Sequence, residues 1–262
     1  KVPVEKDWTA VAQTLLRLPK HALIEQARLL GLAVADAEPA PCGDNGWFEM
    51  CHATQPTSPP TRAARIIDLS SLWAGPLSSL LLQACGCEVI KVESTQRPDG
   101  ARNGSPSFFE FLNAGKTQRQ LPLHTRGGQA QLLELIRSAD IVIEGSRPRA
   151  LRQMGIHAEQ LLDEVPGLTW VSITGYGRTE PEANWVAYGD DAGVAAGLSA
   201  ALRNATGQWM FCGDAIADPF TGLHAALAAL AGFKGGGGRL LALSLVQTVQ
   251  HGIGFARDAE VQ

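Results

Sequence analysis

Short aliphatic segments alternate with longer helix-like segments from residue 65 to the end of the chain, and this alternation limits the fold more than any other feature. The runs Ile141-Val142-Ile143 and Trp170-Val171-Ser172-Ile173 are almost continuously apolar, which is typical of strands in a parallel sheet covered on both faces. The pattern predicts strands at 65–69, 88–92, 140–144, 168–174 and 239–244, and helices at 76–86, 127–138, 158–164, 190–200, 215–233 and 245–256. We therefore expect an α/β fold with an open, doubly wound parallel sheet and helices on both of its faces.

The first 64 residues have a different character. Apolar positions between Asp7 and Leu32 recur mostly at helical spacing, and Pro19 divides them into two predicted helices because its ring and missing N–H interrupt a helix. The segment 35–64 is rich in Pro, Gly, Ser and Thr, which predicts a linker. The expected division is a helical segment at 1–34, a linker at 35–64 and a large α/β domain at 65–262.

Composition and missing motifs exclude several classes of protein. A formal net charge of −4 provides no general attraction for nucleic acid. The five cysteines contain no CxxC pair, which argues against a disulfide framework or a zinc site and fits the reducing cytoplasm. The sequence has no GxGxxG or P-loop motif, no apolar run of the roughly 18 residues that a membrane span needs, and no secretory leader. Because the chain begins with Lys1 rather than Met, we expect it to be part of a longer protein.

The segment 68–76 predicts a ligand-binding corner. It reads as the end of a strand, a tight loop and the start of a helix, and its last residues are Trp73, Ala74, Gly75 and Pro76. Backbone N–H groups without partners point outward from the first turn of a helix, and the peptide dipoles add positive potential there. Such a turn can receive an anion.

Six separate blocks of sequence carry a recognisable pattern. They are Asp68-Leu69-Ser70 with Ala74-Gly75-Pro76, Glu88-Val89-Ile90-Lys91-Val92-Glu93, Leu112-Asn113-Ala114-Gly115-Lys116, Asp140-Ile141-Val142-Ile143-Glu144 with Arg147-Pro148, Gly175-Tyr176-Gly177, and Ala217-Asp218 with Thr221-Gly222. In this order they resemble the class III CoA-transferases, also called the CaiB/BaiF type, over about residues 65–260. The family includes formyl-CoA transferase, carnitine CoA-transferase and α-methylacyl-CoA racemase.

The resemblance implies a Rossmann-like large domain that binds coenzyme A or acyl-CoA as a substrate, with no permanently bound cofactor and no metal. It also implies a small second domain and a homodimer whose two chains are interlocked. The segment 1–34 is similar to the end of the family's small domain, although here it precedes the large domain. That order suggests a fused tandem arrangement as an alternative to the homodimer.

The residues of this chain that match the family's CoA-binding positions are the loop residues Trp73, Ala74, Gly75 and Pro76, and Lys116. Arg97 and Arg147 follow predicted strands, where guanidinium groups could bind the phosphates. Each assignment has a structural alternative: tight helix–strand packing for the small loop residues, and solvated surface positions for the cations. Gly145-Ser146 stands where the family often has Asn-Phe.

The resemblance implies a catalytic aspartate that forms a covalent aspartyl intermediate with the acyl group and then with CoA. The position aligned with the formyl-CoA transferase nucleophile falls near Ala205-Thr206-Gly207, which contains no carboxylate. Asp190 and Asp191 are therefore the candidate catalytic residues. Helix capping is the alternative role for this pair, and the two roles are compatible.

We expect a CoA-transferase that moves CoA between an acyl-CoA and a free carboxylic acid. One alternative is a racemase or epimerase at the α-carbon of an acyl-CoA, with His157 as the histidine candidate. Another is a non-catalytic CoA-binding half of a larger fused protein. Asp214 and Asp218 are expected to cap a helix or contact the ligand, and the run Gly235–Gly238 is expected to be a flexible connector before a strand.

Overall fold

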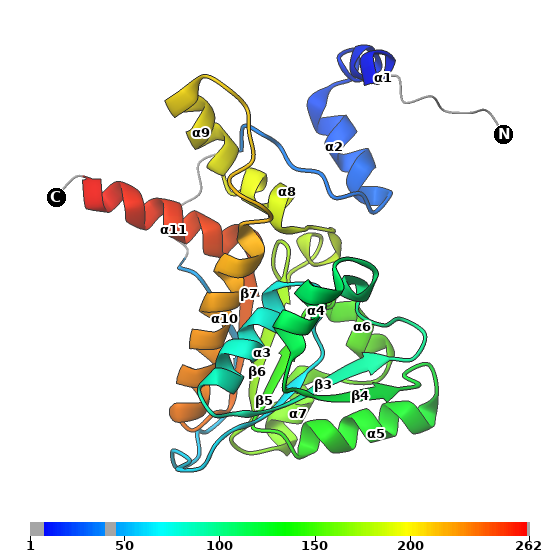
Figure 1. Cartoon of the computed structure of the whole chain (residues 1–262), viewed down its shortest axis with the longest axis vertical. Helices are drawn as coiled ribbons and strands as arrows, with labels where there is room; N and C mark the ends of the chain where they lie inside the picture. Colours follow the sequence, from blue (N-terminus) through cyan, green and yellow to red (C-terminus); the bar gives the residue numbers. More distant parts are fainter. Residues whose placement is uncertain (1–7, 40–45, 261–262) are drawn as a thin grey trace.

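The computed structural model describes residues 8–39 and 46–260 (Figure 1). Within these ranges seven strands form one sheet in the order β1-β7-β6-β5-β2-β3-β4, and every neighbouring pair is parallel except β1 with β7. The strands are β1 (Glu49–Ala53), β2 (Arg65–Asp68), β3 (Glu88–Ser94), β4 (Thr117–Leu121), β5 (Ile141–Glu144), β6 (Thr169–Thr174) and β7 (Arg239–Ser244). The predicted doubly wound α/β fold is confirmed.

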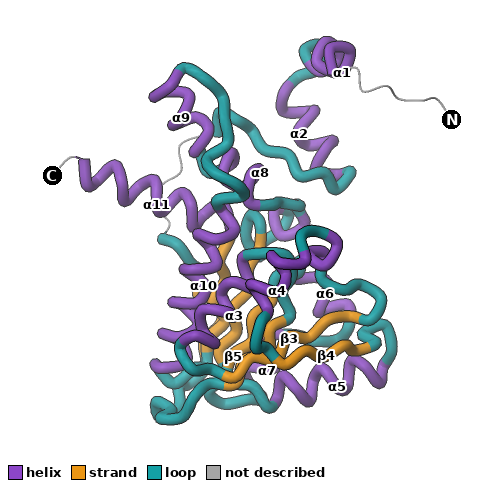
Figure 2. The backbone as a smooth tube through the Cα atoms, viewed as in Figure 1, coloured by secondary structure: helices purple, strands orange, loops and turns teal. Residues whose placement is uncertain are grey.

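Helices cover both faces of the sheet (Figures 1 and 2). They are α1 (Trp8–Leu15), α2 (Lys20–Leu29), α3 (Ala74–Ala84), α4 (Pro106–Asn113), α5 (Arg126–Arg137), α6 (Pro148–Gln153), α7 (Ala158–Glu164), α8 (Gly189–Ala195), α9 (Leu198–Thr206), α10 (Ala217–Lys234) and α11 (Leu245–Glu260), with 3₁₀ turns η1 (Gly100–Asn103) and η2 (Glu182–Asn184). The prediction of one helix over 190–200 is wrong, because Gly197 adopts a left-handed φ of 102° and separates α8 from α9. Among the described helices, none combines the length and the apolar composition that a membrane span requires.

The near-continuous apolar strands are explained by two separate cores. Along β5, Ile141 and Ile143 belong to one buried cluster, with α3 and α10, while Val142 belongs to the other, with α5 and α7. Trp170 and Val171 of β6 are divided in the same way. Successive side chains of a strand point to opposite faces, so a sheet covered on both sides requires an apolar residue at nearly every position.

The sequence pattern did not predict strands β1 and β4, because they lie at the edges of the sheet. All but the last residue of β4 is exposed, and β1 is largely exposed, so neither carries an aliphatic signal. β1 lies inside the predicted linker and pairs antiparallel with β7. The segment 35–64 therefore contributes to the sheet of the large domain, while the division of the chain into domains stays a prediction.

The strand order reverses between β2 and β5. From β2 the chain proceeds outward through β3 and β4, then returns to β5 on the other side of β2 and proceeds through β6 to β7. In doubly wound sheets, ligands bind outside the carboxyl ends of the strands at such a reversal. The loops that begin at Ser70 and Gly145 meet there, since a Cβ added to Gly145 would lie 3.3 Å from Ser70 Cβ.

The glycine run before β7 is a fixed turn and not the flexible connector that the sequence suggested. Gly236, Gly237 and Gly238 are buried and have φ values of 88°, 67° and 70°. Gly236 O accepts hydrogen bonds from Thr57, and Gly238 O accepts one from Thr54 N. The glycines are needed because the backbone is left-handed and packs directly against other backbone.

Replacing Gly237 with alanine is expected to reduce the free energy of unfolding by about 2–3 kcal/mol, because strain from the positive φ adds to a steric clash. An added Cβ would overlap Gly167 O. Gly155→Ala is the matched control: it has a similar φ of 75° and no atom within 4 Å of an added Cβ, so only the backbone strain of about 1 kcal/mol applies. Urea denaturation of both variants measures the difference, and equal losses would contradict the packing role.

Candidate functional site

A cavity of about 620 Å³ opens at the carboxyl ends of the strands, beside the reversal of strand order. Its walls come from the loop after β3, the β5–α6 connection and the segment after β6. The lining includes Arg97, Gly145, Ser146, Arg147, Arg149, Thr174, Gly175 and Tyr188. The structure therefore brings together Arg97 and Arg147, two of the residues that sequence analysis assigned to phosphate binding.

The arginines of this cavity are exposed and available to a ligand. Arg97, Arg147 and Arg149 have no ion-pair partner among the residues that the structure describes. Arg147 Nη1 makes one long contact, 3.4 Å to Asn184 O. Guanidinium groups present several donors in a planar fork that suits phosphate and carboxylate oxygens. The cavity can therefore hold a ligand with several negative charges.

The corner before α3 is closely packed. Trp73 precedes the helix and its ring contacts Phe108 edge to face, with centroids 5.0 Å apart. Gly75 has no room for a Cβ, which would overlap Ser70, and Pro76 is buried. The packing alternative for this corner therefore has direct support. Its role in binding CoA stays a prediction.

Lys116 is buried inside the domain, so the alternative of a solvated surface lysine is wrong. Its Nζ lies 3.3 Å from Asp68 Oδ2, 2.8 Å from Pro76 O, 2.7 Å from Ser79 Oγ and 3.1 Å from Asn113 Oδ1. These bonds tie α3 to the end of β2. The proposed contact of Lys116 with a phosphate stays a prediction, because in this conformation its ammonium is committed to four protein oxygens.

A second buried ion pair shapes the loop before α3. Lys91 Nζ lies 2.9 Å from Asp99 Oδ2, and both side chains are fully buried. Asp99 Oδ1 accepts a hydrogen bond from the backbone N–H of Leu72, which adopts a left-handed φ of 69°. A non-glycine residue in this region is strained and needs such support. No sequence motif indicates this role of Asp99, because the role depends on a contact between two separate loops.

Asp190 and Asp191 lie at the start of α8, next to Tyr188 of the cavity wall. Asp191 Oδ1 accepts a hydrogen bond of 2.7 Å from Tyr188 N, which confirms capping by this residue, while its Oδ2 is buried with no hydrogen-bond partner among the described residues. Asp190 Oδ1 accepts one of 2.8 Å from Ala215 N. Burial, with a contribution from the negative charge of Asp190, raises the pKa of Asp191.

Asp218, in the first turn of α10, completes a group of three carboxyls. The backbone N–H groups of Ala74 and Gly189 donate to its carboxylate, so it joins the beginnings of α3 and α8. Burial raises the pKa of Asp218 to about 6, and the negative charges of Asp191 and Asp190 add to this effect. A carboxyl with such a shifted pKa is typical of functional sites, and Asp218 contacts Gly189, which directly follows Tyr188 of the cavity wall. The sequence predicted either helix capping or a ligand contact for Asp218.

The segment after β6 carries an aromatic pair that the N-terminal helix α2 contacts. Tyr176 and Trp185 pack edge to face with centroids 5.1 Å apart, and the guanidinium carbon of Arg28 lies 3.7 Å from the Trp185 ring centroid. Arg178 connects this segment to the sheet, because its guanidinium pairs at 2.7 Å with the buried Glu144 at the end of β5. Burial raises the pKa of Glu144, although the charge of Arg178 opposes that shift. No motif in the sequence indicates these contacts.

Residues 62–256 match the family model described as CoA-transferase family III. The succinate–glutarate CoA-transferase of Agrobacterium fabrum is 34% identical over 179 residues, covering 63% of this chain and 45% of that protein. The acetyl-CoA:oxalate CoA-transferase of Acetobacter aceti is 33% identical over 143 residues, covering 52% of this chain and 37% of that protein. The chain thus spans less than half the length of these curated relatives.

Solved structures resemble the chain over a similar region. A hypothetical protein of Mycobacterium tuberculosis superposes with a TM-score of 0.68 at 25% identity, covering 79% of this chain and 59% of that one. A CAIB/BAIF family protein of Brucella suis gives a TM-score of 0.61 at 24% identity, covering 78% and 58%. At 24% identity, the likeness to the Brucella suis protein shows a shared fold and nothing more.

Proposed function

The chain belongs to CoA-transferase family III, as its sequence blocks predicted, and from this premise we propose that the protein moves CoA between an acyl-CoA thioester and a free carboxylic acid. The observation that carries the proposal is that Asp190 and Asp191 begin the helix directly after Tyr188, a residue that lines the arginine-containing cavity. An ionised carboxylate and a site for a polyanion are the two parts that this reaction needs.

The proposed reaction proceeds through a covalent intermediate on one aspartate of α8. A carboxylate oxygen attacks the thioester carbonyl carbon, which forms a mixed anhydride and releases the CoA thiolate. The thiolate attacks the aspartyl carbonyl, releasing the donor acid as its carboxylate and leaving an aspartyl-CoA thioester. The acceptor acid then reverses the two steps, leaves as the new acyl-CoA and restores the aspartate. Dividing the exchange in this way replaces one difficult step with easier ones.

We assign the phosphates of CoA to the cavity that holds Arg97, Arg147 and Arg149. The corner Trp73–Pro76 lies at the strand-order reversal, where a nucleotide ligand of a doubly wound sheet is expected. Coenzyme A is a substrate in this scheme and no permanently bound cofactor is required. Because the chain covers less than half of its curated relatives, we propose that the active site is completed by the rest of the polypeptide, in an interlocked homodimer or a fused tandem unit. A cytoplasmic location fits the unpaired cysteines of the described residues.

The test is to incubate the intact polypeptide with a panel of acyl-CoA donors and free acids, trap the intermediate with hydroxylamine and identify the modified tryptic peptide by mass spectrometry. Cleavage after Arg178 and Arg203 gives the peptide 179–203, whose only aspartates are Asp190 and Asp191. Asp214 and Asp218 fall in the next peptide, 204–234. We expect acyl exchange and an aspartyl hydroxamate in 179–203.

Substitution by asparagine at position 190 or 191 is expected to abolish that hydroxamate for one of the two and to lower turnover by about 1,000-fold or more. Asp214→Asn is the control, since this aspartate is exposed on the neighbouring loop. A hydroxamate in 204–234 would move the nucleophile to that segment. The absence of exchange with every donor and acid would contradict the transferase proposal itself.

A further inference from the structure

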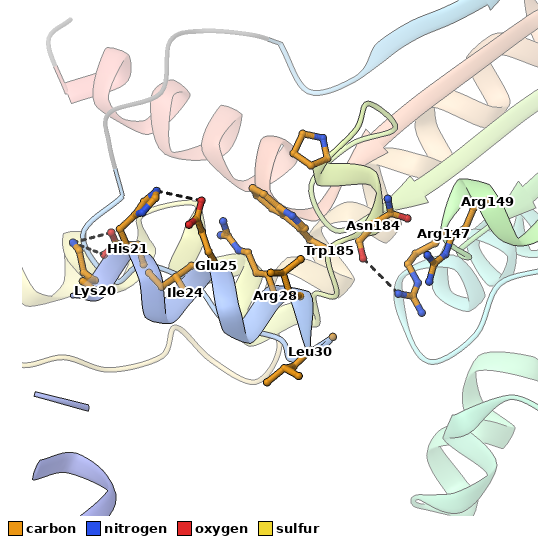
Figure 3. A pocket seen from close by; sticks show the side chains of 14 residues that line it. Lys20, His21, Ile24, Glu25, Arg28, Leu30, Arg147, Arg149, Asn184 and Trp185 are labelled. Atoms are coloured by element: carbon orange, nitrogen blue, oxygen red, sulfur yellow. Dashed lines mark hydrogen bonds and ion pairs between the residues drawn. The ribbon is translucent and has the colours of Figure 1, made fainter. Parts of the chain in front are cut away.

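A larger pocket, of about 960 Å³, lies between α2 and the segment that carries Trp185 (Figure 3). It shares Gly31, Arg147, Arg149 and Trp185 with the cavity assigned to the CoA phosphates, so the two spaces adjoin. Its outer wall is the N-terminal helix, whereas the smaller cavity is built mainly by the loops of the large domain. The pocket thus adjoins the candidate site, but residues of α2 form one of its walls.

The pocket has an excess of positive charge once its internal pairs are removed. Lys20 pairs with Asp36 at 2.8 Å. Glu25 lies 3.5 Å from His21, which is charged only when protonated, so Glu25 offsets at most one positive charge of the pocket. Arg28, Arg147 and Arg149 remain, and none of them has an ion-pair partner among the residues described by the structure. Figure 3 shows Arg28 on α2 facing Trp185, with Arg147 and Arg149 farther along the same opening.

Arg28 is held in one orientation without an acidic partner. Its guanidinium lies over the Trp185 ring at 3.7 Å and 5.4 Å from the Tyr176 ring centroid. Its Nε is buried and has no hydrogen-bond partner among the described residues. A guanidinium that stacks on an aromatic face keeps its edge for a planar anion, and a carboxylate can then bind through two parallel hydrogen bonds. Arg28 is half-buried and makes no ion pair within the described ranges, so an anionic ligand would gain a charge-assisted contact there.

The pocket lies close to the acids of α8. Tyr188 connects the two, since it lines the adjoining cavity and its backbone N–H donates a hydrogen bond of 2.7 Å to Asp191 Oδ1. Exposed Leu29 and Leu30 and the half-buried Ile24 add an apolar wall along α2. A short hydrocarbon chain with a carboxylate at its far end matches this combination of apolar wall and cationic edge. Its other carboxylate would point toward Asp190 and Asp191.

We propose that Arg28 binds the non-reacting carboxylate of a dicarboxylic acid in this pocket and so determines which acids accept CoA. This inference rests on the proposed transferase function. It assigns the phosphates of CoA to Arg97, Arg147 and Arg149, and the distal carboxylate of the acid to Arg28. The N-terminal segment thereby supplies a specificity-determining residue for a site that the large domain otherwise builds.

The experiment compares glutarate with pentanoate, which has the same chain length but one carboxylate, as acceptors for the intact polypeptide. Arg28→Gln is expected to raise the KM for glutarate by about tenfold or more and to leave the KM for pentanoate unchanged, because only glutarate has the second charge. Arg28→Lys should recover only part of the affinity, since an ammonium cannot form the paired bonds. Arg17→Gln removes the same charge from an exposed turn of the N-terminal segment and serves as the matched control.

Two further measurements separate the possible outcomes. Calorimetry with coenzyme A is expected to give the same Kd for the wild type and Arg28→Gln; a selective loss of CoA affinity would make Arg28 a phosphate ligand and overturn the proposal. Saturation-transfer NMR with glutarate and pentanoate measures binding of the acids directly. One outcome separates the two proposals: no acid supports transfer, but glutarate binds to the wild type and does not bind to Arg28→Gln. That result would support the anion site and contradict the transferase function. Equal losses for both acids would indicate a structural role and reject the assignment.

Discussion

Lys116→Met is expected to lower the free energy of unfolding by about 3–5 kcal/mol, because it removes the cation that directly contacts the buried Asp68. Both side chains of this pair are fully buried, with Nζ and Oδ2 3.3 Å apart. The substitution also removes donors to Pro76 O, Ser79 Oγ and Asn113 Oδ1. Urea denaturation should show a lower midpoint with an unchanged slope, which is the mark of a change in stability alone.

The control is Arg137→Gln, which breaks an ion pair with Glu164 whose side chains are 51% and 50% exposed. An exposed pair of this kind contributes about 1 kcal/mol or less. A double-mutant cycle with Asp68→Asn isolates the pair, and we expect the double variant to be more stable than the sum of the single losses predicts. If Lys116→Met cost no more than Arg137→Gln, the ammonium would not be a structural anchor and its assignment to a phosphate would gain support.

Charge and burial also determine the pH dependence of the pair. Burial alone would raise the pKa of Asp68, but the charges of Lys91 and Lys116 outweigh it and hold that pKa below the ordinary value of 3.8. A depressed carboxyl pKa adds stability that is present above the unfolded value and is lost as the pH falls through the folded value. We therefore expect the difference between wild type and Lys116→Met to persist from neutral pH down to about pH 4.

Asp218→Asn is expected to have opposite effects on stability and turnover. The folded pKa of about 6 lies above the unfolded value of 3.8, so the folded protein binds the extra proton between these limits. The stability of the wild type therefore falls as the pH rises through this window, and the full penalty is present above pH 6. The rise of the Asp218 pKa from 3.8 to about 6 corresponds to a destabilisation of about 3 kcal/mol at high pH, which Asp218→Asn removes. The loss of hydrogen bonds from the N–H groups offsets part of this gain in stability.

Turnover is expected to fall by about 100-fold, because Asp218 is a positioning residue that joins the backbone of Ala74 and Gly189. An asparagine side chain retains only one acceptor oxygen, so the beginnings of α3 and α8 lose their common anchor. In the wild type, turnover should decline as the pH falls through about 6, where the carboxyl gains its proton. The variant should lack that step in its pH profile.

The measurements are the melting temperature at pH 5 and pH 8 and the pH profile of turnover. We expect Asp218→Asn to raise the melting temperature relative to wild type more at pH 8 than at pH 5. Asp214→Asn, at an exposed site of the same loop, should change the melting temperature by the same amount at both values of pH. A shift in melting temperature that is the same at both values of pH would contradict the raised pKa of the half-buried Asp218 carboxyl. A turnover profile that keeps its acidic step would assign that step to another group.

The sequence determined the layered α/β architecture and the family. Apolar runs such as Ile141-Val142-Ile143 specify strands that are buried on both faces, and Pro19 separates the two N-terminal helices where predicted. It also placed Arg97 and Arg147 at strand ends, and residues at the carboxyl ends of parallel strands necessarily meet at one edge of the sheet. These features depend on local periodicity and on the geometry of a parallel sheet, which a sequence carries.

The partners of individual polar groups were decided only by the tertiary structure. Lys116 looks like a ligand-binding cation in the sequence, yet folding places its ammonium against Asp68, 48 positions away. Asp218 acquires its raised pKa from burial and from acids on another helix, and Arg28 meets Trp185 across most of the chain. Edge strands β1 and β4 have no apolar pattern to reveal them. Burial and electrostatic environment arise from contacts between distant segments, so they exist only once the chain has folded.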